Sequence, residues 1–154
     1  MIYIAHRCNI DYPRQYWTEN SVEGIKACIK LGLDVEVDVR IIDDDLWLGH
    51  DEPTEQMSLG GFVETATHCW FHCKNLEALK YLGSIYGAKA FWHEDDQFTM
   101  IKDYIFTRPG GRLTPTSIAV MPEMVDYKPE ELAQCYAICT DRWHYYREVV
   151  DGCK

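Results

Sequence analysis

Two carboxylates stand two residues apart in a segment of alternating character. Across residues 33–40 the valines share one face of an extended strand, and the other face carries charged side chains, Glu36 and Asp38 among them. In a strand buried on both faces, two such carboxylates repel each other unless a cation lies between them. The pattern therefore indicates a divalent metal site at Glu36 and Asp38. The alternative is an edge strand whose acidic face meets water.

Three other short segments carry side chains that move protons or bind anions. They are His6-Arg7, His50-Asp51 and His72-Cys73-Lys74. Histidine titrates near neutrality and serves as a general acid or base, whereas arginine and lysine bind phosphate oxygens. Two histidines on opposite sides of a phosphorus atom, beside a cation held by carboxylates, are suited to phosphoryl chemistry.

The elements that must position these residues begin with a strand, a helix and a second strand. Residues 2–5 predict a short buried strand, and residues 33–40 predict the second one. Between them, residues 20–31 predict a helix with a capping-box start at Asn20 and Glu23. Connections of about two residues favour a parallel βαβ unit that is buried on both faces of its sheet.

The rest of the chain predicts further strands and helices, with a less regular pattern after residue 93. The predicted strands are 69–74, 88–93, 117–121 and 137–141, with a hairpin formed by 98–101 and 104–107, and the predicted helices are 76–85, 129–134 and 145–150. No internal repeat or interdomain linker interrupts the sequence. We therefore expect one domain over residues 1–154.

Composition narrows the class of protein. The chain has 154 residues, of which 47% are hydrophobic, and 15 Lys and Arg stand against 25 Asp and Glu, giving a formal net charge of −10. This charge argues against a nucleic acid or an anionic membrane as partner, because a polyanion is repelled over most of the surface. No apolar run approaches the roughly 18 residues of a membrane span.

Seven cysteines are an odd number, and no charged, apolar and cleavable leader opens the sequence. Reduced thiols in the cytoplasm are therefore expected. The pairs Cys69/Cys73 and Cys135/Cys139 are four residues apart, which differs from the CxxC spacing of zinc knuckles and redox motifs. We interpret the cysteines as small apolar packing residues.

Taken together, the short motifs resemble the glycerophosphodiester phosphodiesterase family, within the wider superfamily of phosphatidylinositol phospholipase C-like enzymes. The family pattern is His-Arg-Gly, Glu-Asn-Thr/Ser, Glu-x-Asp and His-Asp, in that order. The chain follows it over residues 4–51 with His6-Arg7, Glu19-Asn20-Ser21, Glu36-Val37-Asp38 and His50-Asp51. Asp141, which follows residues 138–140, also resembles the end of the family's closing strand.

The resemblance implies a TIM-type barrel that hydrolyses a small glycerophosphodiester-like substrate at the C-terminal ends of its strands. Its implied residue roles are general acid and base for His6 and His50, phosphate binding for Arg7 and Lys74, and divalent cation binding for Glu36 and Asp38. In the family's mechanism a neighbouring substrate hydroxyl attacks phosphorus, and water then opens the cyclic phosphate.

Two residues depart from the family pattern. Cys8 stands where the family has glycine, and His72 stands where it usually has an acidic third metal ligand. The family implies Mg²⁺ or Ca²⁺, whereas one imidazole with two carboxylates shifts the preference toward Mn²⁺, Fe²⁺ or Zn²⁺. Two alternatives stay open: a cyclising lyase of the sphingomyelinase D type, and a non-catalytic protein that binds a phosphate metabolite.

Length bears on the fold class as well. A full barrel of this type has about 250 residues, so we expect an α/β fold in the form of a compact, helix-depleted TIM-type barrel. A barrel with a bare flank exposes apolar surface, which predicts a homodimer. We interpret residues 93–96, which hold His93, as a solvated acidic loop and residues 108–112 as a surface turn.

Overall fold

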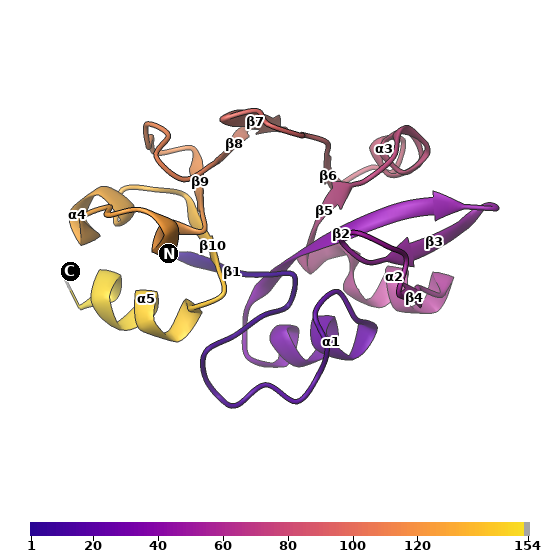
Figure 1. The fold of residues 1–154 in the computed structure, drawn as a ribbon, viewed down its shortest axis with the longest axis horizontal. Coiled ribbons are helices and arrows are strands. Elements are labelled where there is room, and N and C mark those ends of the chain that lie inside the picture. The colour runs from indigo at the N-terminus through magenta and orange to yellow at the C-terminus, as the bar shows by residue number, and fades with distance from the viewer. Residues whose placement is uncertain (153–154) are drawn as a thin grey trace.

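A computed structural model describes residues 1–152, which form one curled sheet with short helices (Figure 1). The strands are β1 (Ile2–His6), β2 (Asp34–Ile42), β3 (Asp45–Leu48), β4 (Glu55–Gln56), β5 (Cys69–Cys73), β6 (Lys89–Phe91), β7 (Phe98–Ile101), β8 (Tyr104–Thr107), β9 (Ser117–Val120) and β10 (Ala137–Thr140). The α-helices are α1 (Val22–Lys30), α2 (Leu59–Thr65), α3 (Leu76–Gly83), α4 (Pro129–Leu132) and α5 (Trp143–Asp151).

Strand β1 lies at the centre of the sheet, parallel to β2 on one side and to β10 on the other. Beyond β10 the sheet continues through β9 and β8 in parallel, and β7 closes this side as an antiparallel partner of β8. On the other side β5 pairs in parallel with β2, and β6 with β5. The far end of β2 forms an antiparallel hairpin with β3, and β4 pairs with β3.

The prediction of a TIM-type barrel is wrong. The protein is a half-barrel: a curled mixed sheet dominates, the helices are short, and no complete ring of alternating β/α units is present among residues 1–152. Between β6 and β9 the described chain forms no helix, and no strand ladder joins β6 to β7. The segment between β6 and β9 forms the hairpin of β7 and β8 together with turns. It therefore has no residues left to form a helix that covers this side of the sheet.

The two faces of the curled sheet are packed differently. On the convex face the valines of β2 and Phe71 of β5 pack against helices, with Ile25 of α1 and Leu82 of α3 fully buried. On the concave face lies a second apolar cluster, which includes Ile4, Trp70 and Phe91. Both faces of the parallel strands are therefore buried, as the βαβ prediction requires.

The start of α1 differs in detail from the prediction. Ser21 caps the helix, because its Oγ accepts a hydrogen bond from the amide of Gly24 at 3.0 Å. Asn20, the predicted cap, adopts φ +49° and turns its side chain away from the helix. The predicted helix itself is confirmed, whereas its capping residue is not.

The flank around β7 lacks a covering helix, and two apolar side chains lie exposed on it. Phe98 is 50% exposed and Met100 is 72% exposed. Nothing in the structure shows what covers them, so the homodimer stays a prediction. Within residues 1–152, no helix has the length and apolar character that crossing a membrane requires.

Candidate functional site

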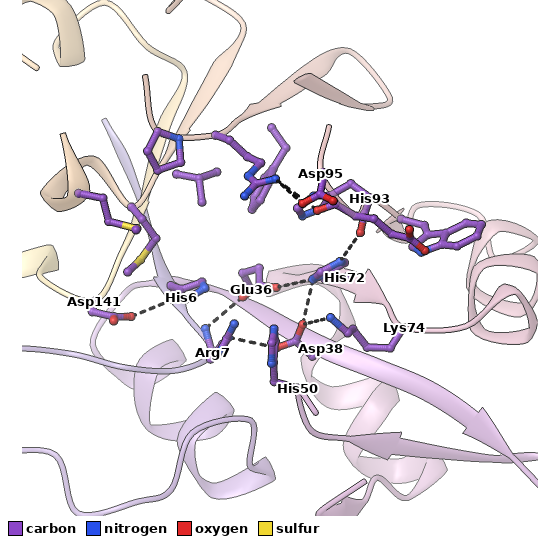
Figure 2. Close-up of a pocket in the computed structure, with 18 of the residues that line it drawn as sticks. His6, Arg7, Glu36, Asp38, His50, His72, Lys74, His93, Asp95 and Asp141 are labelled. Carbon is purple, nitrogen blue, oxygen red and sulfur yellow. Dashed lines mark hydrogen bonds and ion pairs between the residues drawn. The ribbon is translucent and has the colours of Figure 1, made fainter. Parts of the chain in front are cut away.

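The seven residues predicted from the sequence line one cavity of about 990 Å³ at the C-terminal ends of the central strands. They are His6, Arg7, Glu36, Asp38, His50, His72 and Lys74. Figure 2 shows Glu36, Asp38 and His72 pointing toward one another, with His6 on one side of them and Lys74 on the other. Strand register explains the meeting, because Glu36 aligns with His6 across β1 and Asp38 aligns with His72 across β5.

Glu36, Asp38 and His72 form a buried cluster that could hold a metal ion. One ligand atom from each residue lies within 4.8 Å of the others. Nδ1 of His72 is 2.9 Å from Oδ1 of Asp38 and 3.8 Å from Oε1 of Glu36. The two carboxylate side chains are only 3% and 1% exposed, so water screens their repulsion poorly.

The orientation of the His72 ring follows from the contact of its second nitrogen. Nε2 of His72 lies 3.3 Å from the backbone carbonyl of His93. A carbonyl only accepts, so Nε2 carries a hydrogen, and Nδ1 is the nitrogen that faces the two carboxylates. This is the arrangement of a metal-binding histidine whose other nitrogen is fixed by a backbone carbonyl.

Asp38 contacts more charged and polar side chains than the other two residues of the cluster do. Asn20 holds it from both sides, donating from Nδ2 to Oδ2 at 2.9 Å and accepting from the Asp38 amide at 2.9 Å. Arg7 Nε lies 3.3 Å from Oδ2, and Lys74 Nζ lies 3.7 Å from Oδ1. Burial alone would raise the pKa of Asp38, but His72, Asn20 and Arg7 hold it well below its usual range.

Glu36 shows the opposite behaviour. Burial and the charge of Asp38 raise the pKa of Glu36, although His6, His72 and the amide of Arg7, 3.1 Å from Oε2, oppose this rise. Oδ1 of Asp38 is buried, and among the described residues it has the ion contacts with His72 and Lys74 but no well-aligned hydrogen bond. A divalent cation would satisfy that oxygen and relieve the repulsion that disfavours ionised Glu36, so the donor set fits a metal.

His6 is held by a carboxylate from the closing strand. Its Nδ1 lies 3.0 Å from Oδ1 of Asp141, and Asp141 in turn is fixed by Glu123, which accepts from the Asp141 amide at 3.0 Å. Burial alone would lower the pKa of His6, but the contact with Asp141 and the charges of Glu36 and Asp141 outweigh it and raise that pKa. Nε2 of His6 is left for other partners.

The turn after β1 brings Arg7 to the cavity. Arg7 and Cys8 both adopt left-handed backbone, with φ of +52° and +66°. Cys8 therefore occupies, at some cost in strain, the conformation that the family's glycine would adopt most easily. The turn keeps the Arg7 guanidinium beside Oδ2 of Asp38, and Lys74 lies beside the other oxygen, on the opposite side of Asp38 (Figure 2).

His50 lies at the rim, on the loop that follows β3. Its side chain is 30% exposed, and its Nδ1 is 2.7 Å from Oδ1 of Asp51. Arg40 fixes the loop by donating from Nη2 to the His50 carbonyl at 2.9 Å. The structure thus brings His50 to the cavity but holds it less firmly than His6.

Several contributors escaped the sequence analysis. Asn20 supports Asp38, Glu123 fixes Asp141, and Arg108 and His93 line the cavity. The interpretation of His93 as part of a solvated loop is wrong, since its ring stacks on His72 with centroids 4.5 Å apart. A signal was present for His93, because an alternating strand ending at residue 93 places that residue on the same face as residue 91.

The cavity is acidic overall. Six carboxylate side chains and three Lys or Arg side chains are among its lining residues. A phosphodiester anion would meet net repulsion there unless a divalent cation joined it.

The six cysteines within residues 1–152 are free and buried, as packing residues would be, and Cys153 lies outside the described residues. Burial raises the pKa of the Cys69 thiol to about 12. The cysteines contribute no ligand to the cluster of Glu36, Asp38 and His72.

Comparison of the chain with models of protein families, with curated proteins and with solved structures finds no match.

Proposed function

We propose that the protein is a divalent-metal-dependent phosphodiesterase that acts on a small glycerophosphodiester-like substrate. One observation carries the proposal. A buried cluster of two carboxylates and a histidine lies in the same cavity as a carboxylate-paired histidine, an arginine and a lysine. These groups come from separate strands and loops, and together they suit phosphodiester hydrolysis.

In this proposal Glu36, Asp38 and His72 would hold the metal. The bound cation would neutralise charge that develops on the non-bridging phosphate oxygens. The resemblance in sequence favours Mg²⁺ or Ca²⁺, and the imidazole of His72 favours Mn²⁺ or Zn²⁺. We propose the second pair, because Nδ1 of His72 faces both carboxylates.

The chain's own residues supply proton transfer and substrate binding. His6, with Nδ1 held by Asp141, moves a proton at Nε2, and His50 moves one at the rim. Arg7 and Lys74, now beside Asp38, bind the phosphate oxygens of the substrate. Asp141 is a positioning residue that fixes the ring of His6 and favours its protonated form.

Turnover of glycerophosphocholine and of bis(p-nitrophenyl) phosphate, with and without Mn²⁺, tests the proposal. We expect metal-dependent turnover that falls by about 100-fold or more in His6→Ala and His50→Ala. His68→Ala is the matched control, because His68 lies outside the cavity lining, beside Asp34. Unchanged turnover in both cavity variants would show that these histidines are not the acid and base.

Phosphorus NMR of the products separates the proposal from its rivals. A phosphomonoester is the expected end product, and a cyclic phosphate that persists would identify a lyase. Binding of inorganic phosphate without turnover of either substrate would favour a non-catalytic role.

The predicted homodimer also belongs to the proposal. Exposed Phe98 and Met100 on the uncovered flank support it. Light scattering at micromolar concentration should give the mass of two chains, and the mass of one chain would contradict it.

A further inference from the structure

His93, two residues beyond the end of β6, carries an imidazole whose position the proposed metal site does not yet explain. The ring of His93 lies nearly parallel to that of His72, at a centroid distance of 4.5 Å and an interplanar angle of 17°. Phe91, two residues earlier, lies nearly parallel to His72 as well, at 5.1 Å and 6°. Two aromatic rings, one at the end of β6 and one two residues beyond it, therefore define the plane in which His72 can lie.

The same residue also fixes the direction of the His72 ring. Its backbone carbonyl accepts from Nε2 of His72 at 3.3 Å, and a ring turned by half a revolution would lose this bond. With Nε2 held there, Nδ1 faces Asp38 and Glu36. The side chain of His93 thus sets the plane of the His72 ring, and the backbone carbonyl of His93 sets which edge of that ring faces the carboxylates.

His93 is itself held in place from behind. Arg108, at the end of β8, donates from Nη1 to the carbonyl of Glu94 at 3.3 Å and pairs with Asp95 at 3.5 Å. Its amide donates to the carbonyl of Gln97 at 3.0 Å. These contacts hold residues 94–97 against Arg108, which directly follows β8. Because His93 directly precedes this segment, its backbone is held in place as well.

The His93 ring makes no competing polar contact. Its Nδ1 is buried and has no hydrogen-bond partner among the described residues. The His93 side chain therefore acts on His72 through ring contact and not through a hydrogen bond.

We propose that His93 is a positioning residue for the metal site, which orients the His72 ring so that Nδ1 is its ligating nitrogen. The inference rests on the proposed metal site and adds how that site keeps its nitrogen ligand. Arg108 supports it by tying down residues 94–97. The stacking function needs a flat ring at position 93, whereas the ring nitrogens of His93 are not required.

Titration of the metal-free protein with Mn²⁺ and with Zn²⁺ by calorimetry tests the proposal in wild type, His93→Ala and His93→Phe. We expect metal affinity to fall by about 10- to 100-fold in His93→Ala. His93→Phe keeps the stacked ring, so it should bind metal nearly as wild type does. His68→Ala serves as control and should leave the affinity unchanged.

Nitrogen NMR of the Zn²⁺-loaded wild type gives a second readout. We expect Nδ1 of His72 to be the coordinated nitrogen and Nε2 to keep its hydrogen. This readout and His93→Phe keep the proposal open to refutation even if His93→Ala fails to fold. Unchanged affinity in a folded His93→Ala, an equal loss in His93→Phe, or coordination through Nε2 would each overturn it.

The outcomes separate this proposal from the proposed function. A wild-type protein that binds metal but hydrolyses no phosphodiester would overturn the function and leave the role of His93 to be decided by the variants. An active wild type whose metal affinity does not respond to His93→Ala would overturn only the role of His93. A wild type that binds neither cation would overturn both.

Discussion

The same three strands, β2, β5 and β6, place charged groups at both ends of the concave face, and the two ends are built differently. At the N-terminal end one carboxylate, Asp34, is fully partnered. Trp70 Nε1 donates to its Oδ2 at 2.9 Å, Lys89 Nζ donates to the same oxygen at 3.2 Å, and His68 Nδ1 lies 3.2 Å from its Oδ1. Lys89 also lies over the Trp70 ring, at 4.5 Å from its centroid.

At the C-terminal end, two carboxylates share a space that leaves one oxygen without a hydrogen bond. Burial and Asp38 raise the pKa of Glu36, and Oδ1 of Asp38 has the ion contacts with His72 and Lys74 but no well-aligned hydrogen bond within the described part of the chain. We call the Asp34 cluster balanced because both of its carboxylate oxygens have a hydrogen-bonding partner, and the cluster of Glu36 and Asp38 unbalanced because one carboxylate resists ionisation and one oxygen lacks such a bond. A balanced cluster stabilises the end of the sheet, whereas an unbalanced one is suited to bind an ion. The difference, and not the presence of buried charge as such, separates the candidate site from the supporting structure.

The largest expected effect comes from exchanging one carboxylate at each end. Asp38→Asn should lower turnover by about 100- to 1,000-fold, because it removes a negatively charged ligand from the unbalanced cluster. Asp34→Asn should change turnover little. Steady-state kinetics at saturating Mn²⁺ makes the comparison, and equal losses in the two variants would show that both ends serve the reaction.

The stability of the fold, unlike turnover, should depend on Asp34. Asp34→Ala leaves the Trp70 indole without its acceptor and Lys89 with the Thr67 carbonyl but no counter-charge, so we expect the free energy of unfolding to fall by about 2 kcal/mol. Urea denaturation of the metal-free protein measures it. If Asp34→Ala unfolds at the wild-type urea concentration, the balanced cluster contributes nothing to the fold.

Removing charge from the unbalanced end should stabilise the metal-free protein. Glu36→Gln keeps an oxygen that can accept from the Arg7 amide and removes the repulsion with Asp38. We expect a gain of about 1 kcal/mol, which corresponds to about 2–4 °C in Tm for a domain of this size. Scanning calorimetry without metal provides the test, and a lower Tm would mean that the Glu36 charge is already compensated.

The smallest effect concerns the pairing of His6 with Asp141. Because the pKa of His6 is raised in the folded protein, the pairing stabilises the fold at pH values below about 6.5, the ordinary histidine value, and loses this effect as pH rises through the raised value. Asp141→Asn leaves burial and Arg7 to dominate, so the pKa of His6 should drop. A pH titration of the His6 ring by NMR reads it directly, and an unmoved pKa would exclude Asp141 as the cause.

Local patterns predicted most elements and the meeting of the site residues. The alternation in β2 placed Glu36 and Asp38 on the concave face, and the parallel register carried His72 to them. The hairpin of β2 and β3 was missed because its turn uses Asp43 and Asp44 at φ of +50° and +65°, in place of the usual Asn-Gly. Helix α2 was missed because consecutive glycines lower its helix propensity.

What could not be predicted depends on contacts between distant parts of the chain. The role of Asn20 follows from its bonds to Asp38, which exist only after β2 packs beside the first helix. The position of His93 depends on the pairing of β6 with β5 and on Arg108. The expected helix-depleted barrel required a closed ring of strands, whereas β6 and β7 form no ladder with each other. The family resemblance covers residues 4–51 and is thin in that later part of the sequence, so it could not reveal this.

We propose that Glu36, Asp38 and His72 bind one divalent cation, and anomalous diffraction from crystals of the protein saturated with Mn²⁺ tests this. We expect one strong peak bonded to both carboxylates and to Nδ1 of His72. A peak elsewhere in the molecule, with these three side chains keeping their present contacts to Arg7, Lys74 and Asn20, would contradict it.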